Sequence, residues 1–119
     1  EFNGQKWVAE ESFASKEGFG GKVDLHSKAG YIIDFKTKAK DKLDKSVIYE
    51  EFCLQLAAYR SGLDLPNAKC YNLIVSTTIP GTLYLHKWDE EDLKKGLDMF
   101  KHLLAYWKLS VNYDSSWID

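Results

Sequence analysis

Hydrophobic and polar residues alternate along three stretches in the first third of the chain. These stretches are residues 5–14, 20–26 and 31–37. Because successive side chains of a strand point to opposite faces of a sheet, the pattern predicts three consecutive strands. The second and third strands form a hairpin if residues 28–30 are a three-residue loop with Gly30 in the left-handed conformation.

Apolar residues at helical spacing predict two helices in the rest of the chain. The first helix is capped by Asp44 or Ser46 and runs to about Ser61, with Gly62 just past its end. The second helix occupies residues 89–109, with an aspartate at its start as the cap. We expect this second helix to cover the sheet with an apolar stripe made of Leu93, Leu97, Phe100, Leu104 and Trp107.

Two further predicted strands, residues 69–78 and 82–88, lie between the helices. The order is therefore three strands, a helix, two strands and a helix. Such an order predicts an α/β (α+β) fold, a mixed sheet of about five strands flanked by helices. At 119 residues the chain has room for one domain, residues 1–119.

The composition bears on two classes of protein, those that span a membrane and those that bind nucleic acid. No stretch approaches the roughly 18 apolar residues of a membrane span. The net charge of −2 does not indicate a nucleic-acid partner. The distribution of charge leaves a nucleic-acid partner open, because five lysines crowd into ten positions from the end of the third predicted strand onward, either as a phosphate-binding loop or as a solvated one. These are Lys36, Lys38, Lys40, Lys42 and Lys45.

The two cysteines, Cys53 and Cys70, lack the spacing of a metal site. We expect both to be reduced, buried packing residues of an intracellular protein, cytoplasmic or nucleoid-associated.

The predicted hairpin gathers two acids and a lysine. In the proposed register Asp24 stands opposite Asp34, with the two Cβ atoms roughly 5 Å apart. Facing carboxylates destabilise a sheet unless a divalent cation turns their repulsion into attraction. Lys36 lies two residues from Asp34 and shares its face. The hairpin therefore predicts half of a metal site.

The motif GxxD, then IIDFKT, then a helix carrying QLAAY resembles the PD-(D/E)xK nuclease superfamily, in particular its RecB-like exonuclease branch. The resemblance covers residues 20–60 and implies a restriction-endonuclease-like sheet. It implies that Asp24 and Asp34 bind Mg²⁺ or Mn²⁺, and that Lys36 orients the attacking water.

The same resemblance assigns three further positions. The carbonyl of Phe35, between the acid and the lysine, would be a metal ligand. Gln55 and Tyr59 would lie near the scissile phosphate, and their spacing of four residues makes them neighbours on one side of a helix.

The chain departs from the family pattern upstream of the three strands. The family supplies a histidine or glutamate there, often on a helix, as a further metal ligand. Glu10 or Glu11 on the first strand could substitute, and alternation favours Glu10. Alternatively, the chain is a fragment that lacks the N-terminal helix. His26 shares the parity of Asp24, and we expect it to be a solvated or hydrogen-bonded strand residue.

The resemblance implies a Mg²⁺- or Mn²⁺-dependent deoxyribonuclease, an exonuclease first of all, in DNA recombination, repair, or the replication of a virus or mobile element. Its partner would be single- or double-stranded DNA and no membrane, with a homo-oligomer or a larger nuclease complex left open. A catalytically impaired module that binds DNA or protein is the main alternative. A site-specific endonuclease is a weaker one, and RNA stays open as a substrate.

Overall fold

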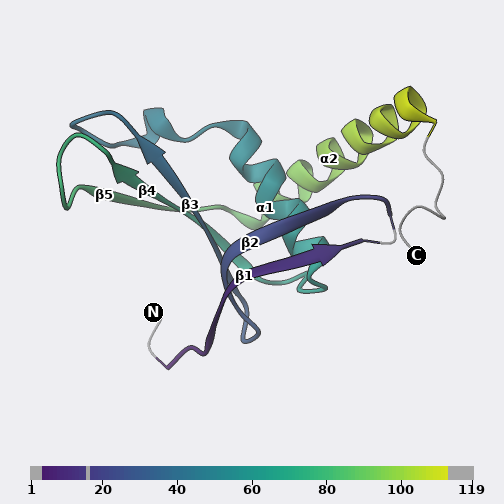
Figure 1. The fold of residues 1–119 in the computed structure, drawn as a ribbon, viewed down its shortest axis with the longest axis horizontal. Coiled ribbons are helices and arrows are strands. Elements are labelled where there is room, and N and C mark those ends of the chain that lie inside the picture. The colour runs from purple at the N-terminus through teal and green to yellow at the C-terminus, as the bar shows by residue number, and fades with distance from the viewer. Residues whose placement is uncertain (1–3, 16, 113–119) are drawn as a thin grey trace.

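The computed structural model describes residues 4–15 and 17–112, which form a five-stranded sheet with two α-helices (Figure 1). The elements are β1 (Trp7–Ala14), β2 (Gly20–Ser27), β3 (Tyr31–Lys38), α1 (Glu50–Gly62), β4 (Lys69–Ser76), β5 (Leu83–Lys87) and α2 (Glu90–Val111). Spatial order follows chain order, and β3 pairs with β4 in parallel while the neighbouring pairs are antiparallel. The α/β class and the mixed sheet are therefore confirmed.

The start of α1 differs from the sequence-based expectation. Asp44 does accept a hydrogen bond from the backbone N–H of Ser46, but the turn it caps is a 3-10 helix (η1, Lys45–Val47). Ile48 and Tyr49 are extended, so α1 begins only at Glu50. The short side chain of Asp44 closes a local turn and does not direct a longer helix.

Gly62 is the last residue of α1, contrary to the expectation that it lies past the end. Its role is close packing, because a Cβ atom there would collide with the ring of Phe13. Gly21 is under a similar constraint, since a Cβ atom there would lie 2.9 Å from Cε1 of Tyr59. The Phe13 and Tyr59 rings meet edge to face, 6.0 Å apart at their centroids. The two glycines thus let β1 and β2 pack directly against α1.

Helix α1 covers the sheet, contacting β2, β3 and β4, and supplies much of the core. Helix α2 packs mainly against α1, so the expectation that its stripe covers the sheet holds only in part. Leu93 joins the core, Leu97 packs against it, and the Phe100 ring meets that of Phe19, just before β2, at 4.8 Å between centroids. The C-terminal half of α2 projects beyond the sheet (Figure 1), and Leu103 and Tyr106 are exposed there.

Both cysteines are unpaired and buried, as expected. Burial raises the pKa of Cys53 to about 11 and that of Cys70 to about 12, so neither thiol is reactive near neutral pH. In the described part of the chain, neither helix combines the length and the apolar character that crossing a membrane requires.

The sheet divides into two arms between β2 and β3. Their ladder has three pairs, Leu25↔Ile33, His26↔Ile32 and Ser27↔Tyr31. Beyond these pairs β2 continues with β1 while β3 continues with β4, and the two arms diverge in Figure 1. We call the point of divergence the fork. The next residues beyond the ladder pair Leu25↔Ile33, toward the point of divergence, are Asp24 on β2 and Asp34 on β3.

Candidate active site at the fork

The hairpin register at the fork agrees with the register expected from the sequence. The loop has three residues, and Gly30 adopts a φ of +120°. The pair Leu25↔Ile33 places Asp24 and Asp34 next in line, but the backbone ladder stops before them. The carboxylate of Asp24 instead accepts the N–H of Phe35 at 2.8 Å. The side chain thus satisfies a backbone donor that the parting strands leave unpaired.

Asp34 carries the most perturbed carboxyl group of the site. It is buried, and burial raises its pKa from 3.8 to about 6, with the neighbouring Asp24 adding to the rise. The hydrogen bond and the charge of Lys36 oppose the rise, because its Nζ lies 3.0 Å from Oδ2 of Asp34. Burial and the neighbouring Asp24 carboxyl group thus outweigh the stabilisation that Lys36 gives to the Asp34 carboxylate.

A chain of hydrogen bonds leads from Lys36 onto α1. Its Nζ donates to Oε1 of Gln55 at 2.8 Å, and Nε2 of Gln55 donates to the hydroxyl of Tyr59 at 2.6 Å. Burial, followed by the charge of Asp34, raises the pKa of Tyr59, which keeps the phenol protonated near neutral pH. The structure thus brings Asp24, Asp34, Lys36, Gln55 and Tyr59 into one connected group.

Asn72 on β4 is part of this group, although the sequence analysis did not identify it. It pairs with Asp34 in the parallel ladder, is completely buried, and its Nδ2 lies 3.4 Å from Oδ2 of Asp34. The indole N–H of Trp88 donates to Oδ1 of Asn72 at 2.8 Å and so fixes the orientation of the amide. An amide next to the apolar run of residues 73–75 was the available signal, because a buried amide needs partners.

Glu10 stands in the same row of the sheet but does not join the group. Ala9↔Leu25 and Glu11↔Val23 flank it, so Glu10 is in register with Asp24. Its φ of +55° lies in the left-handed region, and its carboxylate faces solvent, 3.7 Å from Nζ of Lys22. The proposed role of Glu10 as a metal ligand remains a prediction.

His26 is hydrogen-bonded, one of the two states expected for it. It is buried, and its Nε2 lies 2.9 Å from Oε2 of Glu11. Glu11 is therefore occupied with His26, and neither residue reaches the carboxyl pair through an observed hydrogen bond.

The donor chemistry of the fork fits a hard divalent cation in part. Asp24 and Asp34 offer two adjacent carboxylates, and burial raises the pKa of Asp34, so a bound cation would stabilise its charged form. Among residues 4–15 and 17–112, no cluster of three or more His, Cys, Asp or Glu side chains is arranged to hold a metal ion. A complete ligand set would therefore also need backbone carbonyls, such as that of Phe35, and water.

Comparison with solved structures gives the same kind of fold at low sequence identity. The protein is similar to a structure named "Putative exonuclease" from Eubacterium rectale, with a TM-score of 0.58 and 15% identity over 80% of this chain. It is also similar to a protein designated SSO0001, with a TM-score of 0.50 and 16% identity over 82% of this chain. At these identities the similarity establishes a shared fold alone.

The chain spans 41% of the length of the first of these structures and 50% of the second. No family model and no curated protein matches the sequence.

Proposed function

We propose that the chain is a nuclease domain, or part of one, that hydrolyses phosphodiester bonds in DNA with Mg²⁺ or Mn²⁺, preferentially from an end. The observation that carries the proposal is the connected group at the fork, in which Asp24, Asp34 and Lys36 meet Gln55 and Tyr59. Recombination, repair, or the replication of a virus or mobile element inside a cell would use such an activity.

In this proposal Asp24, Asp34 and the Phe35 carbonyl hold the cation, which when bound supplies positive charge to the scissile phosphate. Lys36 orients the attacking water. Its ammonium group has three N–H donors, of which Asp34 and Gln55 fix two, so the third can meet water or a phosphate oxygen. Tyr59 accepts from Gln55 and keeps its own proton to donate to a phosphate oxygen.

A binding module that holds DNA or a protein without cutting is the second candidate. Glu10 is the observation that favours it, because this carboxylate pairs with Lys22 and is 73% exposed, with no hydrogen bond to the fork observed in the described residues. A site with two carboxylates and no third would bind a cation weakly.

The test is cleavage of linear duplex, linear single-stranded and closed circular DNA across a titration of Mg²⁺ and of Mn²⁺. Asp34→Asn and Lys36→Gln remove the two charged partners with little change in volume. Matched controls are Asp64→Asn, in the turn after α1, and Lys101→Gln, an exposed residue of α2. We expect loss of linear DNA by the wild type and both controls, and at least a hundredfold slower cleavage by the two fork variants.

Cutting of closed circular DNA, which has no ends, would show that the chain is an endonuclease and not an exonuclease. Failure of the wild type to cut any DNA in either metal, with binding retained, would reject the nuclease and favour the binding module. Equal loss of activity in fork and control variants would reject the assigned site.

A further inference from the structure

Lysine and aromatic side chains form a continuous strip that leads away from the fork along β3 and the start of α1. Nζ of Lys36 lies 5.1 Å from the ring centroid of Phe52, and the Phe52 and Tyr49 rings are 5.2 Å apart. The Tyr49 hydroxyl accepts a hydrogen bond from Nζ of Lys38 at 2.6 Å. We call these four residues the strip, and its inner end, Lys36, is also a member of the fork.

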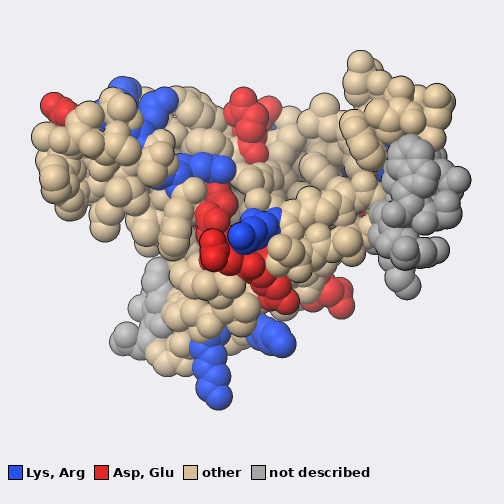
Figure 2. Space-filling model, viewed as in Figure 1, with Lys and Arg blue, Asp and Glu red and all other residues tan. Residues whose placement is uncertain are grey.

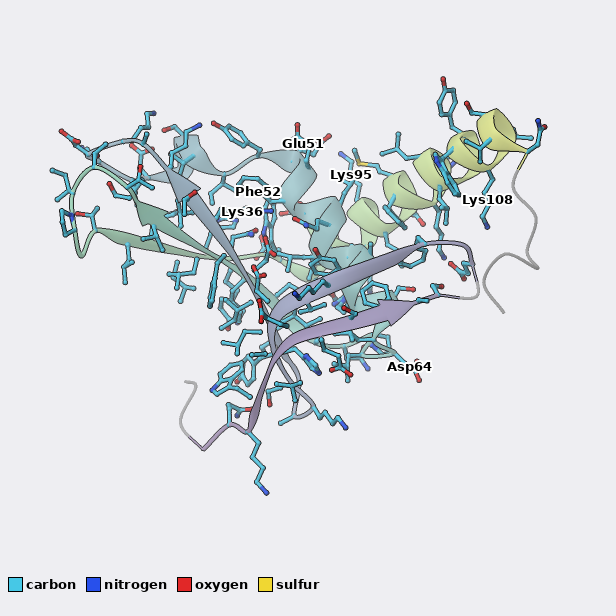
Figure 3. The ribbon with its side chains drawn as sticks, in the orientation of Figure 1. Lys36, Glu51, Phe52, Asp64, Lys95 and Lys108 are labelled. Carbon is cyan, nitrogen blue, oxygen red and sulfur yellow. The ribbon has the colours of Figure 1, made fainter. Side chains whose placement is uncertain are left out.

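The strip is open to solvent. The Tyr49 side chain is 41% exposed and that of Phe52 is partly exposed. The acids of the first turn of α1, Glu50 and Glu51, line a groove toward α2 instead. In Figure 3 Phe52 lies beside Lys36, whereas Glu51 points away from both. The acids at the start of α1 are therefore turned away from the outer part of the strip, and the carboxylate next to its inner end is Asp34 of the fork.

The lysine-rich segment that follows β3 is anchored rather than loose. Oγ of Ser76 donates to the carbonyl of Lys40 at 2.6 Å, and Oγ1 of Thr78 donates to Asp41 at 2.6 Å. At the end of the parallel ladder between β3 and β4, the N–H of Thr77 donates to the carbonyl of Lys38 at 3.0 Å. Basic side chains gather in this part of the molecule, where β3 leads to α1 (Figure 2). An anchored basic segment presents its charges at lower entropic cost.

We propose that the strip binds single-stranded DNA and leads it to the fork, so that the proposed nuclease acts on a single-stranded end. The proposal rests on the proposed function. Tyr49 and Phe52 would stack on unpaired bases, while Lys38 and the lysines of the anchored segment after β3 would contact the DNA phosphates. Paired bases are already stacked within a duplex and cannot offer their faces to these rings. The strip thus selects an unpaired strand.

The binding test uses fluorescence anisotropy in EDTA, which prevents metal-dependent cleavage. The probes are a labelled oligo-dT of 12 nucleotides, the same oligomer with abasic sites, a blunt duplex hairpin, and oligo-rU of the same length. Wild type should bind oligo-dT at least about fivefold more tightly than the abasic oligomer, because stacking contributes about 1–3 kcal/mol per base.

Tyr49→Ala should weaken oligo-dT binding about fivefold or more and leave the abasic oligomer unaffected. Tyr49→Phe keeps the ring and should retain most of the affinity. Lys38→Gln should weaken both oligomers and reduce the salt dependence. The matched controls are Tyr106→Ala, which removes a 74% exposed ring from α2, and Lys101→Gln, also on α2. Both controls should bind as wild type.

Equal binding of oligo-dT, abasic oligomer and duplex would overturn the proposal, as would equal effects of Tyr49→Ala and Tyr106→Ala. Tighter binding of oligo-rU would overturn the choice of DNA. A cleavage assay with Mn²⁺ distinguishes failure of the proposed nuclease activity from failure of the proposed DNA-binding strip. Ring-dependent binding without cleavage would reject the nuclease and keep the strip, whereas cleavage that ignores Tyr49→Ala would keep the nuclease and reject the strip.

Discussion

Two ion pairs in this domain bury opposite partners. In the first, Nη1 of Arg60 lies 2.6 Å from Oε2 of Glu90, with the arginine side chain 7% exposed and the glutamate 47% exposed. In the second, at the fork, the carboxylate of Asp34 is 4% exposed and its partner Lys36 is 28% exposed. One pair buries the cation and the other buries the anion.

The buried cation is fully accommodated. Nη1 of Arg60 also donates to the carbonyl of Ala68 at 3.2 Å, and the pair joins the end of α1 to the first turn of α2. Arginine does not lose its proton in proteins, so the buried member of this pair has one charge state. Its role is to hold two helices together.

The buried anion is less well compensated. Burial raises the pKa of Asp34 to about 6, and the neighbouring Asp24 carboxyl group adds to the rise. A carboxyl group can resolve such a conflict by taking a proton, or by binding a cation. Buried charge alone therefore does not indicate function, whereas a buried carboxyl group with too little positive charge around it is typical of a functional site.

The largest expected effect on stability tests the first pair. Glu90→Ala leaves Arg60 buried without a counterion and should lower the free energy of unfolding by about 3–5 kcal/mol. Urea unfolding measures the loss. Glu91→Ala removes a neighbouring exposed acid from the same first turn and should cost less than about 1 kcal/mol. A similar small loss in both variants would show that Arg60 finds water or another partner.

The pH dependence of stability tests the second pair. Because the folded pKa of Asp34 lies above its unfolded value, folding favours the protonated form, and this contribution is lost as pH rises from about 4 through about 6. A rise from 3.8 to about 6 corresponds to about 3 kcal/mol. Asp34→Asn carries no such penalty, so in EDTA it should be more stable than wild type at pH 7.5 by up to that amount, and nearly equal at pH 4.

Asp44→Asn provides a control of opposite sign. Hydrogen bonds from Ser46 lower the pKa of Asp44, so its contribution is present at neutral pH and is lost as pH falls. Urea unfolding between about pH 2.5 and 7.5 compares the two variants with wild type, because the Asp44 contribution is lost only below its ordinary pKa of 3.8. A stability difference between Asp34→Asn and wild type that does not vary with pH would contradict a raised pKa of the buried Asp34 carboxyl group.

Binding of Mn²⁺ should stabilise the fold through the Asp34 pair and not through the Arg60–Glu90 pair. At pH 7.5, Mn²⁺ at 100 times its dissociation constant should stabilise the wild type by about 2.7 kcal/mol. The gain should shrink below about pH 6, because protonation of Asp34 competes with the cation. Thermal unfolding with and without Mn²⁺ measures it. Asp34→Asn should remove the gain and Asp64→Asn should keep it, and equal gains in both would place the cation elsewhere.

Much of the fold could be predicted from local patterns. Alternation identified β1 to β3, and the three-residue loop with Gly30 set the hairpin register that brings Asp24 and Asp34 together. The helices were predicted from apolar spacing, which does not determine partners. The stripe of α2 was therefore assigned to the sheet, although the helix packs mainly on α1.

The parts that could not be predicted depend on contacts distant in sequence. Gly62 suited a helix end, but the constraint on it comes from Phe13, far away in the chain. Strand alternation favoured Glu10 for the cleft and could not anticipate its positive φ. Asn72 joins the candidate site through the parallel ladder with β3, a pairing that a single sequence does not specify.

The smallest expected effect concerns the support that Asn72 gives to the buried anion. Trp88→Phe removes the donor to Oδ1 of Asn72 and should cost about 1 kcal/mol of stability by urea unfolding. Because the freed amide no longer holds its N–H group toward Asp34, the pH at which DNA cleavage reaches half its maximum should move upward. Trp107→Phe, on a 44% exposed indole of α2, should leave that pH unchanged. An unchanged profile in Trp88→Phe would restrict Asn72 to packing between β3 and β4, and the buried anion at the fork would then depend on Lys36 alone.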